Sequence, residues 1–421
     1  MKYTAGSRAG IKGAEDCILE KSIREVCREL FTRTGYYLRW YHDEPLFVSR
    51  EREKETERLH AILYKTICFM AEHYKEYTDR YMPLTRKTME ILDYQSRYPF
   101  RAGAWRPDFI LAENGDIKLC EITSRFFAHG IWTSWYPECA ADRFMEKHPG
   151  ADRRSSFEEM LLYMKDLPGD KDRIFVLRST DRTNEIELYQ AFYEYYGRKV
   201  VILNADEVEP RIDEWRDAFV ISALNQKDLL SYSMDTLKAM VDAGMVNDFR
   251  TIFLIHDKRF MRLWFKDDFT GRFLTDEETA FLRERSIETF VCGEKESSEV
   301  MKDAYQHKDR YILKHYCLGK SERVYAGPLT DEKAWRALWV NGSIHEMVLQ
   351  PFIKQKYYPV VWEGTAFNDY VSVMLLCVND RFFGCGMVRS SSLPVTNVGD
   401  DRKISCVYTD CEEIINRERL L

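Results

Sequence analysis

Apolar residues recur at helical intervals through the first part of the chain. In the long stretch Glu51–Tyr81 they return every three or four residues, which places them on one face of a helix. The residues of that face are Leu59, Leu63, Ile67 and Met70. A similar pattern predicts a helix over Glu15–Arg33, so residues 15–95 are expected to be largely helical.

The pattern then changes to two short apolar strands joined by an Asn-Gly turn, within Arg106–Thr123. Strand alternation puts Arg106 and Asp108 on one face of the first strand, and Glu121 and Thr123 on one face of the second. Two carboxylates, a hydroxyl and an arginine therefore converge across one antiparallel pair. Such groups suit Mg²⁺ and phosphate. An edge hairpin with ordinary surface charges is the alternative interpretation.

Short buried strands alternate with helices after a boundary at Pro168–Asp170. The expected strands are Ile174–Leu177, Val200–Leu203, Ala218–Ser222 and Thr251–Ile255, with a helix over Asn184–Tyr196. This alternation predicts a βαβ unit with a parallel sheet, which binds ligands beyond the carboxyl ends of its strands. The tripeptide His256–Lys258 follows the last expected strand, and an ordinary loop is an equal interpretation of it.

The C-terminal part is rich in strands, preceded by one helix with a clear start. Thr275 and Glu278 form a capping-box pattern, which predicts a helix through Arg285. The expected strands are Tyr311–Lys314, Met347–Phe352, Tyr370–Val378 and Phe382–Arg389.

Composition narrows the class of protein. Hydrophobic residues make up 45% and charged residues 31%, as in ordinary globular proteins, and the 14% of aromatic residues can build a core and line a ligand cleft. A net charge of −7 offers no general attraction to nucleic acid. The 11 cysteines form no CxxC pair, Met1–Lys21 has no apolar signal segment, and no apolar run has the length that a bilayer requires. We therefore expect a cytoplasmic protein with reduced thiols and no membrane or nucleic-acid partner.

Two further segments suit a nucleotide. The strand Tyr311–Lys314 ends in a lysine and is followed by a loop, Cys317–Gly327, that can cradle phosphates with its N–H groups. A loop with only two glycines is more often an ordinary connection than a phosphate loop. At Gln350–Ile353 a buried strand runs into a proline, which leaves main-chain groups for an adenine edge or simply ends an edge strand. The pair Gly384-x-Gly386 lies inside a strand and is no Rossmann fingerprint.

Taken in order, these motifs resemble the ATP-grasp superfamily in the circularly permuted arrangement of glutathionylspermidine-synthase-like ligases. That family carries Arg-x-Asp, about a dozen residues, and then Glu-x-Asn, which Arg106, Asp108 and Glu121 match. In ordinary ATP-grasp enzymes the acidic motif follows the lysines, whereas here it lies far upstream of Lys314. The strand Ile-Leu-Lys, the segment Leu-Gln-Pro-Phe and the motif Phe-x-Gly-x-Gly-x-x-Arg follow in the family's order.

The sequence departs from the family in two places. Thr123 stands where the family has asparagine, so one of two Mg²⁺ ions is expected to be bound more weakly or through water. His315 follows Lys314, where the family has a Lys-Pro pair that opens a glycine-rich loop.

The resemblance implies an α/β (α+β) fold: an ATP-grasp fold in circularly permuted order, with a helical N-terminal part and a Rossmann-like pre-ATP-grasp subdomain. Residues 1–165 would hold the helical region and the metal-binding hairpin, residues 166–260 the pre-ATP-grasp subdomain, and residues 261–421 the nucleotide-binding lobes.

The resemblance also implies the reaction and the residues that serve it. ATP and Mg²⁺ would activate a small carboxylic acid as an acyl phosphate, releasing ADP, and an amine or a carrier-protein thiol would then displace phosphate. The catalytic residues would be Arg106 and Arg389, and the metal ligands Asp108, Glu121 and Thr123. The nucleotide would contact Lys314, with Lys295 as a second candidate, and Gly319, Lys320, Ser321, Gln350, Pro351, Phe352 and Ile353. The aromatic loop with Arg125, His129 and Trp132 would meet the acid, or else pack between lobes.

Two other functions stay open at this point. The chain could be a non-catalytic nucleotide-binding protein with a degenerate ATP-grasp fold, which Thr123 favours. It could also be an unrelated α/β enzyme whose active domain is residues 174–255. A homodimer is only the default expectation for a soluble protein.

Overall fold

The computed structural model describes residues 42, 44–127, 134–153, 157–179, 186–319, 321–362, 364–396, 402–409 and 411–421. The expected helix Glu15–Arg33 lies outside them. The described residues form a mixed α/β fold with several β-sheets, as the sequence predicted.

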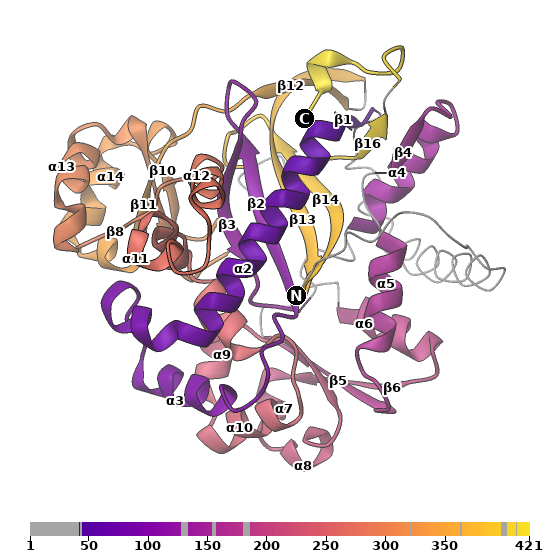
Figure 1. The fold of residues 1–421 in the computed structure, drawn as a ribbon, viewed down its shortest axis with the longest axis vertical. Helices are drawn as coiled ribbons and strands as arrows, with labels where there is room; N and C mark the ends of the chain where they lie inside the picture. Colours follow the sequence, from indigo (N-terminus) through magenta and orange to yellow (C-terminus); the bar gives the residue numbers. More distant parts are fainter. Residues whose placement is uncertain are drawn as a thin grey trace.

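A six-stranded antiparallel sheet forms the centre of the molecule (Figure 1). Its order is β15-β14-β13-β2-β3, with β12 paired to β13. The strands are β2 Ala104–Leu111, β3 Ile117–Thr123, β12 Tyr357–Trp362, β13 Thr365–Val378, β14 Arg381–Ser391 and β15 Arg402–Ile404. The predicted hairpin and the two predicted C-terminal strands of this sheet are confirmed.

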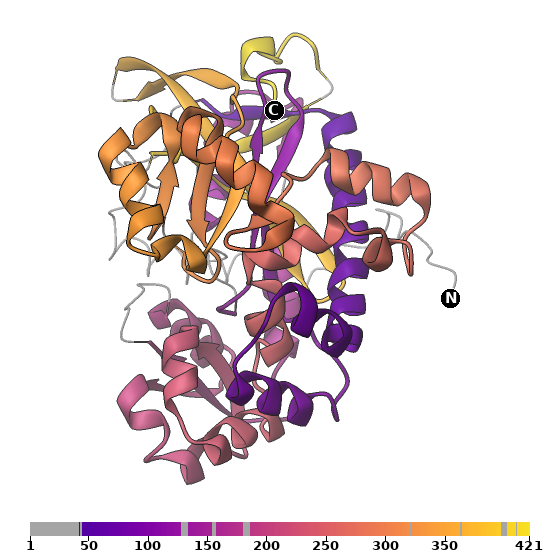
Figure 2. The same cartoon turned by 90° about the vertical axis from the view of Figure 1, so that its left-hand side faces the viewer.

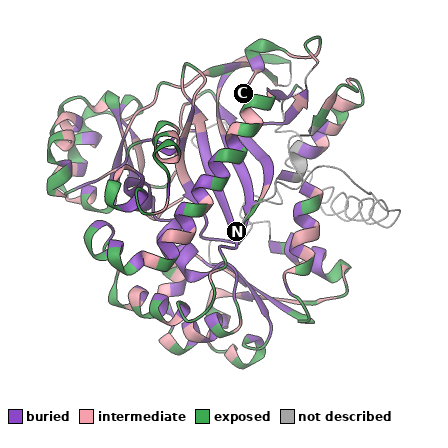
Figure 3. Cartoon of the chain, in the orientation of Figure 1, coloured by how far each residue is buried: buried purple, intermediate pink, exposed green. Residues whose placement is uncertain are grey.

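The long helix α2, Arg50–Tyr81, crosses one face of this sheet. Ser49 caps its first turn, and the predicted apolar face is buried against the sheet. On β2, Trp105, Phe109 and Leu111 point into this core. Because strand side chains alternate, Asp108 and Ile110 must point to the other face. Figure 3 shows the central strands buried while the outer surface of α2 is exposed.

A second sheet of four antiparallel strands lies beside the first and carries the order β10-β9-β11-β8. Its strands are β8 Phe290–Val291, β9 Tyr311–His315, β10 Val324–Ala326 and β11 Met347–Pro351. The helices α13, Ser298–Gln306, and α14, Glu332–Val340, cover one face around the buried Trp335. In Figure 2 this lobe is orange and lies apart from the pink parallel sheet. Its other face turns toward the central sheet.

The third sheet is parallel and has three described strands in the order β6-β5-β7. They are β5 Arg173–Arg178, β6 Lys199–Asn204 and β7 Phe219–Ala223, and α6 Ile186–Tyr195 follows β5. The predicted fourth strand is wrong, because Thr251–Ile255 forms a π-helical turn, η3. All five residues of that turn are buried, and periodicity cannot distinguish a short, fully apolar run in a strand from one in a buried helix.

The remaining elements connect these sheets. A small sheet in the order β1-β16-β4 joins β1 Leu46–Val48, β16 Cys406–Thr409 and β4 Ala151–Arg153. The predicted capping box at Thr275 and Glu278 is confirmed at the start of α12, Asp276–Glu284. The other helices are α3 Arg86–Gln95, α4 Trp135–Met145, α5 Phe157–Asp166, α7 Ala205–Val208, α8 Ile212–Trp215, α9 Gln226–Ser231, α10 Met234–Asp242, α11 Asp267–Thr270, η4 Lys258–Phe265, η5 Lys295–Ser297, η6 Lys308–Arg310, η7 Gly327–Leu329, η8 Ser343–Glu346 and η9 Arg417–Arg419.

None of the helices in the described ranges combines the length and the apolar character needed to cross a membrane. The parallel sheet lies within residues 166–260 and the four-stranded sheet within residues 261–421. The predicted domain boundaries themselves stay a prediction.

Candidate functional site

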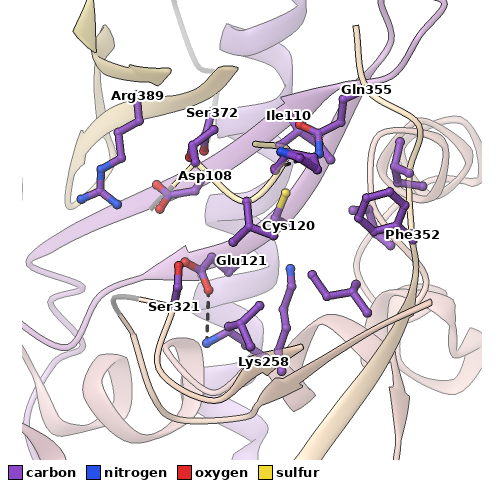
Figure 4. A pocket seen from close by; sticks show the side chains of 18 of the residues that line it. Asp108, Ile110, Cys120, Glu121, Lys258, Ser321, Phe352, Gln355, Ser372 and Arg389 are labelled. Atoms are coloured by element: carbon purple, nitrogen blue, oxygen red, sulfur yellow. Dashed lines mark hydrogen bonds and ion pairs between the residues drawn. The ribbon is translucent and has the colours of Figure 1, made fainter. Parts of the chain in front are cut away.

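A cavity lies between the free face of the central sheet and the facing side of the four-stranded sheet (Figure 4). Its empty space, including the part open to solvent, is about 860 Å³. The predicted site residues that line it are Asp108, Glu121, Lys314, Gly319, Ser321, Pro351, Phe352, Ile353 and Arg389. Residues more than 280 positions apart in the sequence therefore meet at one place.

A β-bulge brings the two acidic side chains together. Near the turn, Leu111 pairs with Ile117 and Phe109 with Leu119. Continued regularly, this register would place Asp108 opposite Cys120 and turn Glu121 to the other face of the sheet. The register shifts after Phe109, so that Asp108 pairs with Glu121. Both carboxylates and the Cys120 side chain therefore line the same cavity.

Asp108 is held by a buried arginine on its own strand. The Arg106 guanidinium donates from Nε to Oδ1 at 2.7 Å and from Nη2 to Oδ2 at 2.8 Å. The Thr123 hydroxyl lies 3.4 Å from Oδ2. Burial raises the pKa of Asp108 and the Glu121 carboxylate adds to this, while the guanidinium opposes both. The two-pronged hydrogen bonding is that of an ionised carboxylate.

Glu121 forms an ion pair with a lysine from a distant segment. Lys258 Nζ lies 3.1 Å from Glu121 Oε2 and donates a hydrogen bond to the Leu318 carbonyl at 2.7 Å. Burial alone would raise the pKa of Glu121, but Lys258 and Lys314 attract its charge and lower the pKa below the usual range. Lys258 thus joins the carboxylate to the loop after β9.

Neutral groups surround this charged centre. Burial lowers the pKa of His256 to about 3 and raises the pKa of Cys120 to about 11. The imidazole is therefore uncharged and the thiol protonated at neutral pH. Cys120 is accordingly a poor candidate for a nucleophile.

The four-stranded sheet supplies the opposite wall. Ile312 and Lys314 are two residues apart on β9, so both point toward the cavity, while Leu313 between them packs into the core of the lobe. Val324 lies opposite Lys314 on β10 and also lines the cavity. The Lys314 side chain is largely buried.

Arg389 and Ser372 form one end of the cavity. They are paired across β14 and β13, on the same face of the central sheet as Asp108. Figure 4 shows Arg389, Ser372 and Asp108 at one side and Phe352 at the other, with Glu121 and Lys258 between them. The cavity therefore has a polar end at Arg389 and an apolar end at Phe352, with Glu121 and Lys258 between the two ends.

The apolar end is the connection between the two sheets. Pro351 ends β11, and the Phe352 N–H donates to the Arg310 carbonyl at 2.8 Å, so that group is already used. Within the described residues, the main-chain N–H and carbonyl of Ile353 have no hydrogen-bond partner. Further on, the Lys356 N–H donates to the Leu111 carbonyl at 3.0 Å and anchors the connection to the hairpin. Ile353 is thus placed to offer a donor and an acceptor to a planar base.

The loop after β9 lines the cavity, and at Gly319 its backbone lies close to the Arg125 guanidinium. A Cβ at Gly319 would lie 3.3 Å from Arg125 Nη2. Arg125 is itself buried and its guanidinium lies 4.6 Å from the Phe126 ring centroid. The structure therefore places Arg125 beneath this loop, and it is not among the side chains that line the cavity.

Other predicted site residues lie elsewhere. Lys295 lines a separate outer groove with Trp339. Gln350 is fully buried and donates to the Thr289 hydroxyl at 2.9 Å. Arg106, Gln350 and Thr123 do not line the cavity. His129, Trp132 and Lys320 lie outside the described residues.

The cavity also contains residues that the motifs did not select. Lys258 is the clearest, since the sequence signal was only its position after an expected strand that is in fact helical. Ser372, Gln355 and Thr396 line the cavity as well. Ser372 is recognised only when its strand is known to pair with the strand of Arg389. A single sequence does not determine which strands pair.

The acidic groups alone do not make a closed metal site. Across the described residues, no group of three or more His, Cys, Asp and Glu side chains is arranged to hold a metal ion. Mg²⁺ is often held by one or two carboxylates together with phosphate oxygens and water. Glu121 and Asp108 on one wall of the cavity fit a cation that arrives with a nucleotide.

Comparisons with known proteins give limited similarity. The family described as "AnkG N-terminal domain" matches residues 57–254, which is less than half of the chain. This stretch contains most of α2, the β2–β3 hairpin and the parallel sheet. A search of curated proteins gives no match.

Among solved structures, one similar chain is described as "Putative gamma-glutamylcysteine synthetase" from Methylobacillus flagellatus KT. The similarity covers 82% of this chain and 85% of that one, at 8% sequence identity and a TM-score of 0.36. Values this low establish no shared fold.

Proposed function

We propose that this chain is an ATP- and Mg²⁺-dependent ligase that activates a small carboxylic acid and transfers the acyl group to an amine or a carrier-protein thiol. The observation that carries this proposal is the single cavity in which Asp108, Glu121, Lys258, Lys314 and Arg389 converge beside the apolar connection at Ile353. The order of sequence motifs that resembles permuted ATP-grasp ligases adds to it.

The cavity offers one surface for each part of a nucleotide. The base would lie against Phe352 and use the main chain of Ile353 as donor and acceptor. The phosphates would lie between Lys314 and Lys258, with the N–H groups of the loop at Gly319 beside them. Three cations line the cavity against two carboxylates, which favours a polyphosphate.

A magnesium ion bound with the nucleotide would neutralise charge between the phosphates. Glu121 would hold it from the central sheet, with Asp108 next to it. Arg389, at the polar end, would orient the substrate carboxylate and stabilise negative charge as it develops.

The reaction would proceed in two displacements. A carboxylate oxygen attacks the γ-phosphorus of ATP as the bond to the β–γ bridging oxygen breaks, which gives the acyl phosphate and ADP. The acceptor nitrogen or sulfur then attacks the acyl carbon, phosphate leaves, and the acceptor loses its proton to solvent. Positioning and charge neutralisation supply most of the rate enhancement in such chemistry.

An assay with hydroxylamine tests this proposal. The chain is incubated with ATP, Mg²⁺, hydroxylamine and a panel of carboxylic acids, and the hydroxamate and the nucleotide product are identified. We expect an acid-dependent hydroxamate together with ADP, lost in Arg389→Gln. AMP as the product would contradict the acyl phosphate. Tight ATP binding with no product from any acid would favour the nucleotide-binding protein without turnover.

A further inference from the structure

The two carboxylates of the cavity differ in the capacity that they keep for a cation. An ionised carboxylate has about four acceptor positions. On Asp108 two of them receive hydrogen bonds from Arg106, and the Thr123 hydroxyl lies at a third. Within the described part of the chain Glu121 has one ion pair, at Oε2, and its side chain, which lines the cavity, is 30% exposed. Among the described residues, both oxygens of Asp108 thus have partners, whereas Oε1 of Glu121 has none and can meet a metal.

The neighbouring charges also favour Glu121 over Asp108 as the ligand of a cation. A divalent cation bound to Asp108 would lie within a few ångströms of a buried guanidinium, where like charges repel strongly because little water screens them. The Arg106 and Asp108 side chains are only 7% and 8% exposed. Lys258, whose side chain is 2% exposed, lies similarly close to Glu121, but it meets Oε2 alone, whereas Arg106 meets both oxygens of Asp108.

The third candidate ligand, Thr123, is already directed at Asp108. Thr123 pairs with Arg106 across the hairpin and its hydroxyl donates toward Asp108. Thr123 does not line the cavity, although both carboxylates do. No oxygen at this position is thus available to complete a second metal site.

We propose that the nucleotide site holds one divalent cation, at Glu121, and that Arg106 on Asp108 supplies the positive charge that a second cation would otherwise supply. This inference rests on the proposed function, since the cation arrives with ATP. In this proposal Glu121 is the metal ligand, and Asp108 binds the guanidinium of Arg106 instead of a metal. The two carboxylates then have different tasks although they are neighbours.

Manganese binding tests this assignment without turnover. The full chain is saturated with the non-hydrolysable analogue AMP-PNP and titrated with Mn²⁺, and free Mn²⁺ is measured by electron paramagnetic resonance. We expect one Mn²⁺ per bound nucleotide. Glu121→Gln should weaken its binding about tenfold or more, whereas Asp108→Asn should retain one Mn²⁺ with a smaller loss.

Asp116→Asn, in the turn of the same hairpin and outside the cavity, is the matched control and should leave the Mn²⁺ affinity unchanged. Circular dichroism of each variant checks that it is folded. Two Mn²⁺ ions per bound nucleotide in the wild type would overturn the single-cation proposal alone. The same holds if Asp108→Asn loses Mn²⁺ as completely as Glu121→Gln. Absence of AMP-PNP binding would overturn the proposed function and this inference with it.

Discussion

Individual residues explain why the candidate site has its shape. Lys258 reaches from the start of η4 to Glu121 and to the loop after β9, so one ammonium connects three segments. Asn247 has a similar role in the scaffold. Its amide bonds to Ala104 and Ser124 at 2.8 Å and ties the start of β2 to the end of β3. A sequence names these residue types but not their partners.

Replacing Lys258 tests its contribution to nucleotide binding. Lys258→Met removes a buried positive charge beside the proposed phosphates, so we expect AMP-PNP to bind about tenfold more weakly by isothermal titration calorimetry. Lys118→Met is the control, because the Lys118 ammonium also donates to a main-chain carbonyl but does not line the cavity. Equal affinity in Lys258→Met and the wild type would remove Lys258 from the site.

Two glycines, Gly103 just before β2 and Gly115 in the turn between β2 and β3, give a matched stability test. Both have positive φ, +69° at Gly103 and +88° at Gly115, so alanine is strained at each. At Gly103, however, a Cβ would lie 2.0 Å from Asn247 Oδ1, whereas at Gly115 nothing lies within 4 Å. We expect Gly103→Ala to lower the free energy of unfolding by at least about 2 kcal/mol more than Gly115→Ala in urea denaturation. Similar losses would contradict the role given to Asn247.

Elements were predicted unevenly from the sequence, for physical reasons. Helix α2 and the C-terminal strands have long, regular patterns, and the sequence located them correctly. The strand predicted at Thr251–Ile255 is wrong because a short buried run has no period to distinguish the two states. The bulge at Cys120 is also invisible in the pattern, although it alone turns Glu121 toward Asp108. The sequence analysis predicted that the two carboxylates converge, but it did not predict the β-bulge that brings them together.

The packing of α2 on the central sheet predicts a pH dependence. The His60 ring lies 5.1 Å from the Trp105 ring at 14°, and burial lowers the pKa of His60 from 6.5 to about 4. Folding therefore favours the neutral ring. The contribution of the neutral His60 ring to the free energy of unfolding is complete above pH 6.5. It falls by about 3 kcal/mol as the pH decreases from 6.5 toward 4.

His60→Phe keeps a ring and removes the titration. The difference in urea midpoint between this variant and the wild type should grow in favour of the variant as the pH falls from 7 to 4. A difference that is independent of pH would show that His60 does not carry this term.

At the scale of the whole molecule, two connections join the four-stranded sheet to the central hairpin. One passes Arg285, whose carbonyl accepts from the Leu119 N–H at 2.7 Å, and the other passes Lys356. The cavity lies between the two sheets that they join. The sequence selected residues on both walls, among them Asp108, Lys314 and Arg389, because their motifs follow a recognisable order. It could not predict that Lys295 lies on the outer surface, since that depends on how α13 and α14 cover the lobe.

The measurement that tests the central claim most directly is the binding of AMP-PNP with Mg²⁺ to two lysine variants by isothermal titration calorimetry. Lys314 lines the cavity between the sheets, and Lys295 lines the outer groove. We predict one binding site in the wild type, about tenfold weaker binding in Lys314→Met and unchanged binding in Lys295→Met. Absence of binding in the wild type, or an equal loss in both variants, would contradict the placement of the nucleotide in this cavity.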